Sequence, residues 1–351
     1  MNVPFDYDAI IIGAGAAGLM TAICAAERGR KVLLLEKGKK PGVKILMSGG
    51  TRCNITHDCD ARGIVEAFGP NGKFLHSALA EFGPDDAVAF FEAEGVATKI
   101  EDTGKIFPVS DRAVDVLDAL LRRLNRSGAE LALLEPVTAV TSEADHSFVV
   151  QTAKRSLTCQ SVVITTGGLS FPGCGTTGDG YGFAKQFGHT VTKTVPALVP
   201  LKLDAAWVKE LMGVTLHVGL KVKEGNTVLA ARAGSMLFAH FGLTGPAPLD
   251  VSRAVSGHAS PRTLTLEIDF LPKETEALLD EFLQKESLAS PKQLLAGILS
   301  RKLFRRICDQ LLPLCGLSVD RTAAALSKVD RQKLVAAMKR LAVPLAGTLG
   351  F

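Results

Sequence analysis

Three glycines and one glutamate near the start of the chain have the types and spacing needed to hold a diphosphate and a sugar. Gly13, Gly15 and Gly18 directly follow the apolar run 9–12, and Glu36 stands 18 residues after Gly18. The first glycine permits a tight turn, the second lets the backbone approach a diphosphate, and the third allows close contact between helix and strand. A helix that begins here offers free N–H groups to phosphates, and Glu36 can accept hydrogen bonds from a ribose. The sequence therefore predicts a dinucleotide site.

The elements around these residues occur in the order that such a site requires. Run 9–12 predicts a strand buried on both faces, residues 19–28 predict a helix, and residues 32–35 predict a second buried strand. This strand–helix–strand context separates a dinucleotide site from a glycine-rich turn that binds no ligand.

The glycine pattern alone does not decide between NAD and FAD, but two features favour FAD. The pattern begins twelve residues into the chain, as is common in FAD-binding proteins that carry this glycine pattern. Glu36 is followed by a basic loop at 37–42 and a second loop of small residues at 44–54. This second loop is too long for a simple turn between strand and helix, and long loops at the carboxyl edge of a parallel sheet tend to be functional.

Four long segments resemble the BaiN/RdsA family of NAD(P)/FAD-dependent oxidoreductases, and the resemblance runs from about residue 6 to the last residue. The segments are KILMSGGTRCNIT (44–56), VVITTGGLSFPGCGTTGDGYGFAKQFGH (162–189), PALVPL (196–201) and LFAHFGLTGPAPLDVSR (237–253). One departure is Thr51, where many members of the family carry a third glycine.

The resemblance implies an α/β fold: a Rossmann-like FAD-binding domain with an inserted β-rich domain and a small helical domain. The expected bounds are 1–193 for the FAD domain, 194–271 for the β-rich domain and 272–343 for the helical domain. In the family, the chain then returns to the FAD domain with a closing strand, a glycine-rich loop and a helix that meet the flavin. Residues 344–351 are expected to begin that return, and the closing segment itself is expected to be lacking.

The resemblance also assigns residues to the cofactor. The glycine pattern and Glu36 would hold the ADP half, the small-residue loop would lie beside the flavin, and the TTGG segment at 165–168 would cover FAD. Val137 begins a strand that often touches adenine. The expected cofactor-binding residues are Gly13, Ala14, Gly15, Ala16, Ala17, Gly18, Glu36, Lys37, Lys44, Ser48, Gly49, Gly50, Arg52, Asn54, Val137, Thr166, Gly167 and Gly168.

Three residues are candidates for a catalytic role. Arg52 could stabilise an anionic reduced flavin or hold an anionic substrate, or it could form a structural salt bridge. Cys53 could act as an acid or a nucleophile, or could simply pack in the loop. His240 lies in a loop between turn residues, where it could be a general acid or a structural residue. No metal-ligand spacing is present.

Charge is unevenly distributed along the chain. Residues 291–343 contain eleven basic and three acidic residues, a net charge of +8, whereas the whole chain has +4. A basic module on an otherwise acidic enzyme is typical of nucleic-acid binding, although a solvated basic face with no partner is the alternative. We therefore predict an RNA contact through Arg301, Lys302, Arg305 and Arg306.

Composition indicates an ordinary globular enzyme, with 47% hydrophobic and 22% charged residues. Seven cysteines without a CxxC pair favour reduced thiols in the cytoplasm. Residues 1–8 carry no basic residue and so do not form a signal peptide, and no apolar run is long enough to span a membrane.

The expected function is that of an FAD-dependent oxidoreductase, with hydride transfer through flavin N5 and NAD(P)H as the electron donor. Members of the family have been assigned two kinds of substrate: a uridine in ribosomal RNA, or a small organic molecule. The basic module favours RNA. The alternative from another class is a truncated, inactive fragment that binds nucleotides or RNA.

Overall fold

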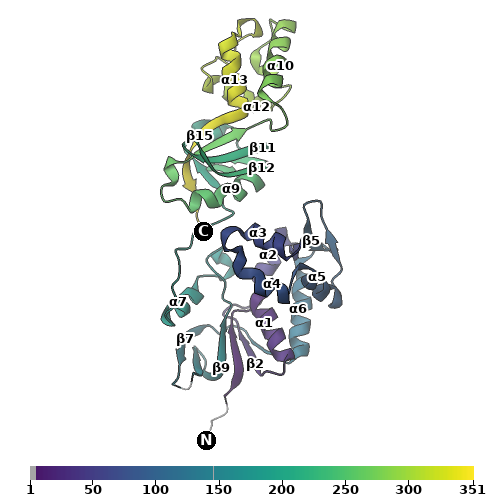
Figure 1. The fold of residues 1–351 in the computed structure, drawn as a ribbon, viewed down its shortest axis with the longest axis vertical. Coiled ribbons are helices and arrows are strands. Elements are labelled where there is room, and N and C mark those ends of the chain that lie inside the picture. Colours follow the sequence, from purple (N-terminus) through teal and green to yellow (C-terminus); the bar gives the residue numbers. More distant parts are fainter. Residues whose placement is uncertain (1–4, 145) are drawn as a thin grey trace. The chain divides into compact units, whose positions relative to one another are not determined.

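The computed structural model describes residues 5–144 and 146–351 (Figure 1). The chain divides into two compact units, Met1–Thr192 and Lys193–Phe351. This division lies next to residue 193, the expected end of the FAD-binding domain.

The first unit is built on a six-stranded sheet with the order β6-β2-β1-β9-β8-β7. Its four parallel strands are β6 (Glu130–Ala132), β2 (Val32–Leu35), β1 (Tyr7–Ile12) and β9 (Ser156–Ile164). Strands β8 (Phe148–Thr152) and β7 (Val137–Ser142) extend the sheet in antiparallel pairing. The predicted strand–helix–strand unit is therefore present at the centre of this sheet.

Both faces of the central strands are covered, which is why they contain continuous apolar runs. On one face, Ile11 and Leu34 pack against helices α1 (Ala16–Glu27) and α6 (Ala113–Ser127) (Figure 1). On the other face, Ile10 and Leu33 share a core with side chains of β7, β8 and β9 and with Phe183 of helix α7 (Asp179–Gln186). The carboxyl ends of these strands are thus held by a rigid, two-sided core.

Smaller elements complete the unit between β2 and α6. They are α2 (Val43–Thr51), β3 (Thr56–His57), α3 (Ala61–Phe68), α4 (His76–Glu81), α5 (Pro84–Ala93), β4 (Thr98–Ile100) and β5 (Lys105–Pro108). A hairpin turn at 101–104 joins β4 to β5. Helix α6 begins after Arg112, and the carboxylate of the preceding residue, Asp111, accepts a hydrogen bond from Lys99 at 2.5 Å.

The second unit contains a closed barrel with the order β10-β13-β12-β11-β14-β15. Its strands are β10 (Leu201–Leu203), β11 (Thr215–Glu224), β12 (Thr227–Ala239), β13 (Gly242–Thr244), β14 (Thr265–Asp269) and β15 (Leu341–Thr348). The helices of this unit are α8 (Ala206–Glu210), α9 (Pro246–Ser256), α10 (Glu276–Ala289), α11 (Leu295–Leu299), α12 (Arg305–Leu314) and α13 (Lys328–Arg340). Side chains of the barrel and the helices share one core.

Residues 344–348 were expected to begin a return to the FAD domain, but the structure places them in the second unit. They belong to β15, where Leu345 pairs with Leu203 and Thr348 pairs with Leu201. Val343 and Leu345 are each only 2% exposed. Their burial places this strand in the barrel between β10 and β14, so these residues close the second unit.

Candidate active site

A cavity of about 580 Å³ opens at the carboxyl ends of β1, β2 and β9. Such an edge of a parallel sheet is where ligands bind in open α/β folds. Thirteen of the residues expected to hold the cofactor line this cavity. They are Gly13, Ala14, Gly15, Ala16, Ala17, Glu36, Lys37, Lys44, Ser48, Asn54, Val137, Thr166 and Gly167. Gly18, Gly49, Gly50, Arg52 and Gly168 are not among the lining residues.

The three glycines of the first turn are glycine for different reasons. Gly13 has φ +105°, and a Cβ there would lie 2.8 Å from the carbonyl oxygen of Thr165. A Cβ on Gly18 would lie 1.9 Å from the carbonyl oxygen of Gly13. The protein's own packing therefore requires glycine at these two positions.

Gly15 has no such internal reason to be glycine. Its φ of −78° suits any residue, and no heavy atom lies within 4 Å of the place where a Cβ would stand. That open space belongs to the cavity, at the start of α1, where no side chain caps the helix. Free amide groups and empty space at a helix N-terminus fit the pyrophosphate of FAD.

Glu36 is oriented by two backbone amides. Its Oε2 accepts a hydrogen bond from Ala14 N at 2.9 Å, and its Oε1 accepts one from Gly38 N at 2.7 Å. Each carboxylate oxygen has a further lone pair, and Glu36 lines the cavity. The side chain can therefore accept hydrogen bonds from ribose hydroxyls without being reoriented.

Two lysines of the cavity wall hold the loop that follows β9. Lys37 Nζ donates to Asp179 Oδ2 at 2.6 Å and to Thr177 Oγ1 at 2.7 Å. Lys44 Nζ donates to Thr176 Oγ1 and to the carbonyl oxygen of Ser170, both at 3.1 Å. These contacts bring the loop after β9 to the same cavity as the loop after β2.

The loop expected at 44–54 is helical in its first part, because α2 begins at Val43. The helix is then interrupted by a kink that starts at Ser48. Ser48 is extended, and Gly49, Gly50 and Thr51 have φ values of 56°, 69° and 71°. Left-handed backbone strains a β-branched residue such as threonine. This gives a physical reason for the glycine that many family members carry at position 51.

Cys53 and Arg52 are adjacent in sequence, but their side chains have different surroundings. Cys53 lines the cavity and is 7% exposed, and its burial raises the pKa of the thiol although Ser48 partly opposes the effect. Arg52 donates to Glu101 at 2.5 Å and lies 3.4 Å from Asp111, with its guanidinium 4.0 Å from the ring centre of Phe107. Arg52 therefore forms the salt bridges that are expected if its role is structural.

His240 lies in the second unit, in the turn between β12 and β13, with its ring 4.9 Å from that of Phe241. The residues that line the cavity all belong to the first unit. A catalytic role for His240 therefore stays a prediction from the sequence.

Several residues that line the cavity were not among the expected site residues. Glu135 is a buried acid, Cys174 and Thr176 come from the loop after β9, and Phe82 and Phe91 form an aromatic wall with their neighbour Phe90. Only the tertiary structure brings these segments together.

The basic residues of the helical region have nearby partners. Arg301 pairs with Glu286, Lys302 with Glu274 at 2.9 Å and Arg305 with Asp309 at 2.8 Å, while Arg306 donates to the carbonyl oxygens of Glu210 and Met212. Residues 272–290 supply Glu274 and Glu286, and over 272–343 thirteen basic and eight acidic residues leave a net charge of +5. The surface is therefore less basic than the stretch 291–343 suggests.

Residues 7–348 match the family model described as HI0933-like protein Rossmann domain. The chain belongs to this HI0933-like family. It is 34% identical over 348 residues to a protein named ribosomal RNA dihydrouridine synthase from Escherichia coli, with 98% of this chain and 83% of the relative covered. It is 30% identical over 348 residues to the 3-dehydro-bile acid delta(4,6)-reductase of Clostridium scindens, with 97% and 83% covered.

These matches confirm the resemblance drawn from the four sequence segments and the α/β fold class. The protein is an FAD-dependent oxidoreductase of this family. Within the residues that the structure describes, no helix is long and apolar enough to cross a membrane, and no group of acidic, histidine or cysteine side chains could hold a metal ion.

Proposed function

We propose that this protein reduces a uridine in ribosomal RNA, with NAD(P)H as the electron donor. The observation that carries the proposal is the 34% identity to a ribosomal RNA dihydrouridine synthase, which extends over 98% of this chain and so includes both units. The cavity supports the oxidoreductase part of the proposal, because Gly15 and Glu36 fit the pyrophosphate and ribose of FAD.

A second candidate is the reduction of a small apolar molecule. The 30% identity to a bile acid reductase favours it, as does the apolar wall that Phe82, Phe90 and Phe91 give to the cavity. Steroid-like rings would find such a wall favourable, because aromatic side chains bury large apolar areas.

Reduction of the C5–C6 double bond of uracil needs a hydride at C6 and a proton at C5. Bound FAD supplies the hydride chemistry. Cys53 is the proton donor that we propose at C5, because burial raises its thiol pKa and so keeps the proton on sulfur at neutral pH. A base that is paired or stacked in folded rRNA would have to be exposed or flipped out to reach the cavity.

We expect Cys53→Ala to lower the rate of uridine reduction by about 100-fold, the usual size of a lost proton donor, while FAD stays bound. In the unaltered protein, the rate should fall only as the pH rises through the raised pKa of this thiol. Single-turnover rates measured across pH would test both statements.

Cys59→Ala is the control for this experiment, because Cys59 is also a free cysteine but does not line the cavity. An unchanged rate in Cys53→Ala would exclude Cys53 as the acid.

The function itself can be tested with FAD-loaded protein, NADH or NADPH, and rRNA from a strain without its own rRNA dihydrouridine synthase. We expect mass spectrometry of the digested RNA to detect dihydrouridine only when protein and donor are both present. A 3-oxo-4,6-diene steroid is the parallel substrate. Turnover of the steroid alone would favour the second candidate, and turnover of neither would contradict both.

RNA contact through Arg301, Lys302, Arg305 and Arg306 is part of the proposal. Among these four residues, Arg305 is the one most available to a phosphate, because its side chain is 52% exposed. Its partner Asp309 lies on the same helix. The carboxylates of Glu286 and Glu274 reduce the charge that Arg301 and Lys302 offer to phosphates. Arg306 keeps its charge, but its guanidinium donates to the carbonyl oxygens of Glu210 and Met212.

A further inference from the structure

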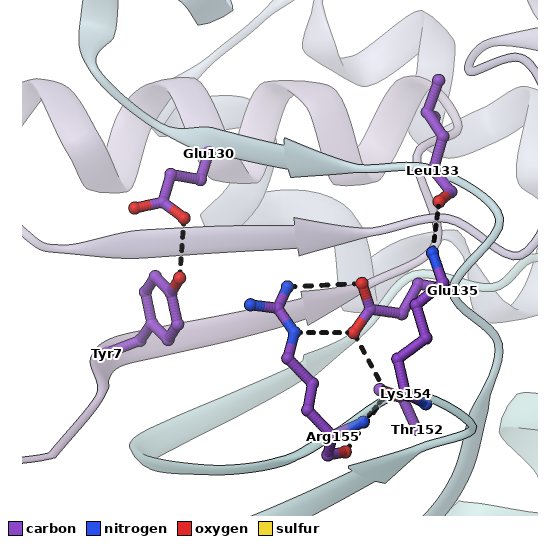
Figure 2. Close-up of polar contacts among 7 residues, drawn as sticks. All are labelled: Tyr7, Glu130, Leu133, Glu135, Thr152, Lys154 and Arg155. Atoms are coloured by element: carbon purple, nitrogen blue, oxygen red, sulfur yellow. Dashed lines mark hydrogen bonds and ion pairs between the residues drawn. The ribbon is translucent and has the colours of Figure 1, made fainter.

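Glu135 is a buried carboxylate in the wall of the cavity, on the segment that joins β6 to β7 (Figure 2). It is 4% exposed. Its Oε1 accepts hydrogen bonds from Arg155 Nε at 2.8 Å and Thr152 Oγ1 at 3.0 Å, and its Oε2 lies 3.3 Å from Arg155 Nη2. Thr152 is the last residue of β8 and Arg155 directly precedes β9, so these contacts join two segments that are distant in sequence.

The backbone of the same segment runs beside Glu36, the residue expected to bind the ribose. Glu135 N donates to the carbonyl oxygen of Glu36 at 3.0 Å, and Leu134 N donates to that of Gly38 at 3.1 Å. Pro136 and Val137, the next residues, also line the cavity. With the ribose of FAD at Glu36, this segment would form the cavity wall at the adenosine end.

This segment contains a strained residue. Leu134 has φ +55°, in the left-handed region that a leucine rarely adopts. Such conformations persist only where the surroundings hold them. The contacts that hold this one are the two backbone hydrogen bonds, the Glu135–Arg155 pair and a longer contact of 3.4 Å from Lys154 Nζ to the carbonyl oxygen of Leu133 (Figure 2).

Removing Arg155 would leave Glu135 as an unpaired charge in a buried position, which proteins avoid by moving or protonating the group. The guanidinium of Arg155 also holds the pKa of the Glu135 carboxyl below its ordinary value, so the pair is intact at neutral pH. Movement of Glu135 would displace Pro136 and Val137 with it.

We propose that the Arg155–Glu135 pair positions the cavity wall against the adenosine half of FAD and thereby sets the preference of this protein for FAD over FMN. Both residues are positioning residues, because they act through the segment 134–137. The proposal concerns cofactor choice and does not depend on which substrate is reduced.

The test is a comparison of two flavins. FMN lacks the adenosine, so it makes no use of this wall. In Arg155→Met and in Arg155→Met/Glu135→Gln, which leaves no buried charge, we expect the Kd for FAD to rise about 10-fold or more, and the Kd for FMN to change less than about twofold. Arg155→Lys keeps a charged donor and should retain part of the preference. Titration of the apoprotein by flavin fluorescence measures each Kd.

Glu27→Gln is the matched control. Glu27 forms a bidentate pair with Arg123 of similar geometry, with distances of 2.8 and 3.1 Å, but neither residue lines the cavity. Affinity for both flavins should be unchanged in this variant. Should Arg155→Met not fold, Thr152→Val is the second variant, because it removes one hydrogen bond to Glu135. It should raise the Kd for FAD by a smaller factor and leave the Kd for FMN nearly unchanged. Equal loss of FAD and FMN, or no loss of FAD, would overturn the proposal.

Discussion

We expect Gly15→Leu to abolish the retention of FAD and to leave the fold of the first unit intact. The leucine side chain would project into the open part of the cavity at the start of α1, where the pyrophosphate has to approach the backbone. We expect the Kd for FAD to rise by at least about 100-fold. The apoprotein should lose less than about 1 kcal/mol of unfolding free energy, because the φ of −78° at this position suits any residue.

The measurements are flavin content after purification, the Kd of the apoprotein for FAD, and thermal unfolding without flavin. Gly182→Leu is the control. A Cβ at Gly182 would also meet no heavy atom within 4 Å, and its φ is not positive, but this residue lies on α7 and does not line the cavity. Wild-type affinity in Gly15→Leu would mean that the pyrophosphate does not lie at this turn.

Glu36→Arg is expected to have the second largest effect, again a loss of FAD affinity of about 100-fold or more. The substitution removes the acceptor of the amides of Ala14 and Gly38 and replaces the acceptor of the ribose with a donor. Glu36→Gln keeps one acceptor oxygen and loses the charge. Since hydrogen bonds to charged groups contribute about 1.5–3 kcal/mol, this milder change should weaken FAD binding by about 10- to 100-fold.

Asp8→Asn serves as the control for Glu36. Asp8 lies at the other end of β1, where its carboxylate accepts a hydrogen bond from Lys31 N at 2.7 Å, and it does not line the cavity. This change should leave FAD binding unaltered. If Glu36→Gln and Asp8→Asn have the same Kd for FAD, the ribose does not bind at Glu36.

The parts of the fold and site that could be predicted from the sequence depend on local order. Gly13, Gly15, Gly18 and Glu36 lie within one strand–helix–strand unit, whose spacing reports directly on the turn that it must form. The pattern also distinguishes the three glycines, and Gly15 is the one with open space where a Cβ would stand. The contact that requires glycine at position 13 could not be predicted, because it is made by Thr165, which is far away in sequence.

The remaining features depend on pairing between distant segments. Arg52 meets Glu101 and Asp111, which are 49 and 59 residues away, and no spacing rule connects them. Glu135 depends in the same way on Arg155, 20 residues later. The charge of the helical region was overestimated because the window began after α10, whose Glu286 pairs with Arg301.

The pairing of β10 with β15 has a consequence for how members of this family can diverge. Leu201 and Thr348 are direct partners although almost the whole second unit lies between them in sequence. A stretch of chain whose first and last strands are neighbours can be lengthened, shortened or exchanged between homologues as a single piece, since no new gap has to be bridged. Selection can therefore act on this half of the protein separately from the half that carries the glycine turn.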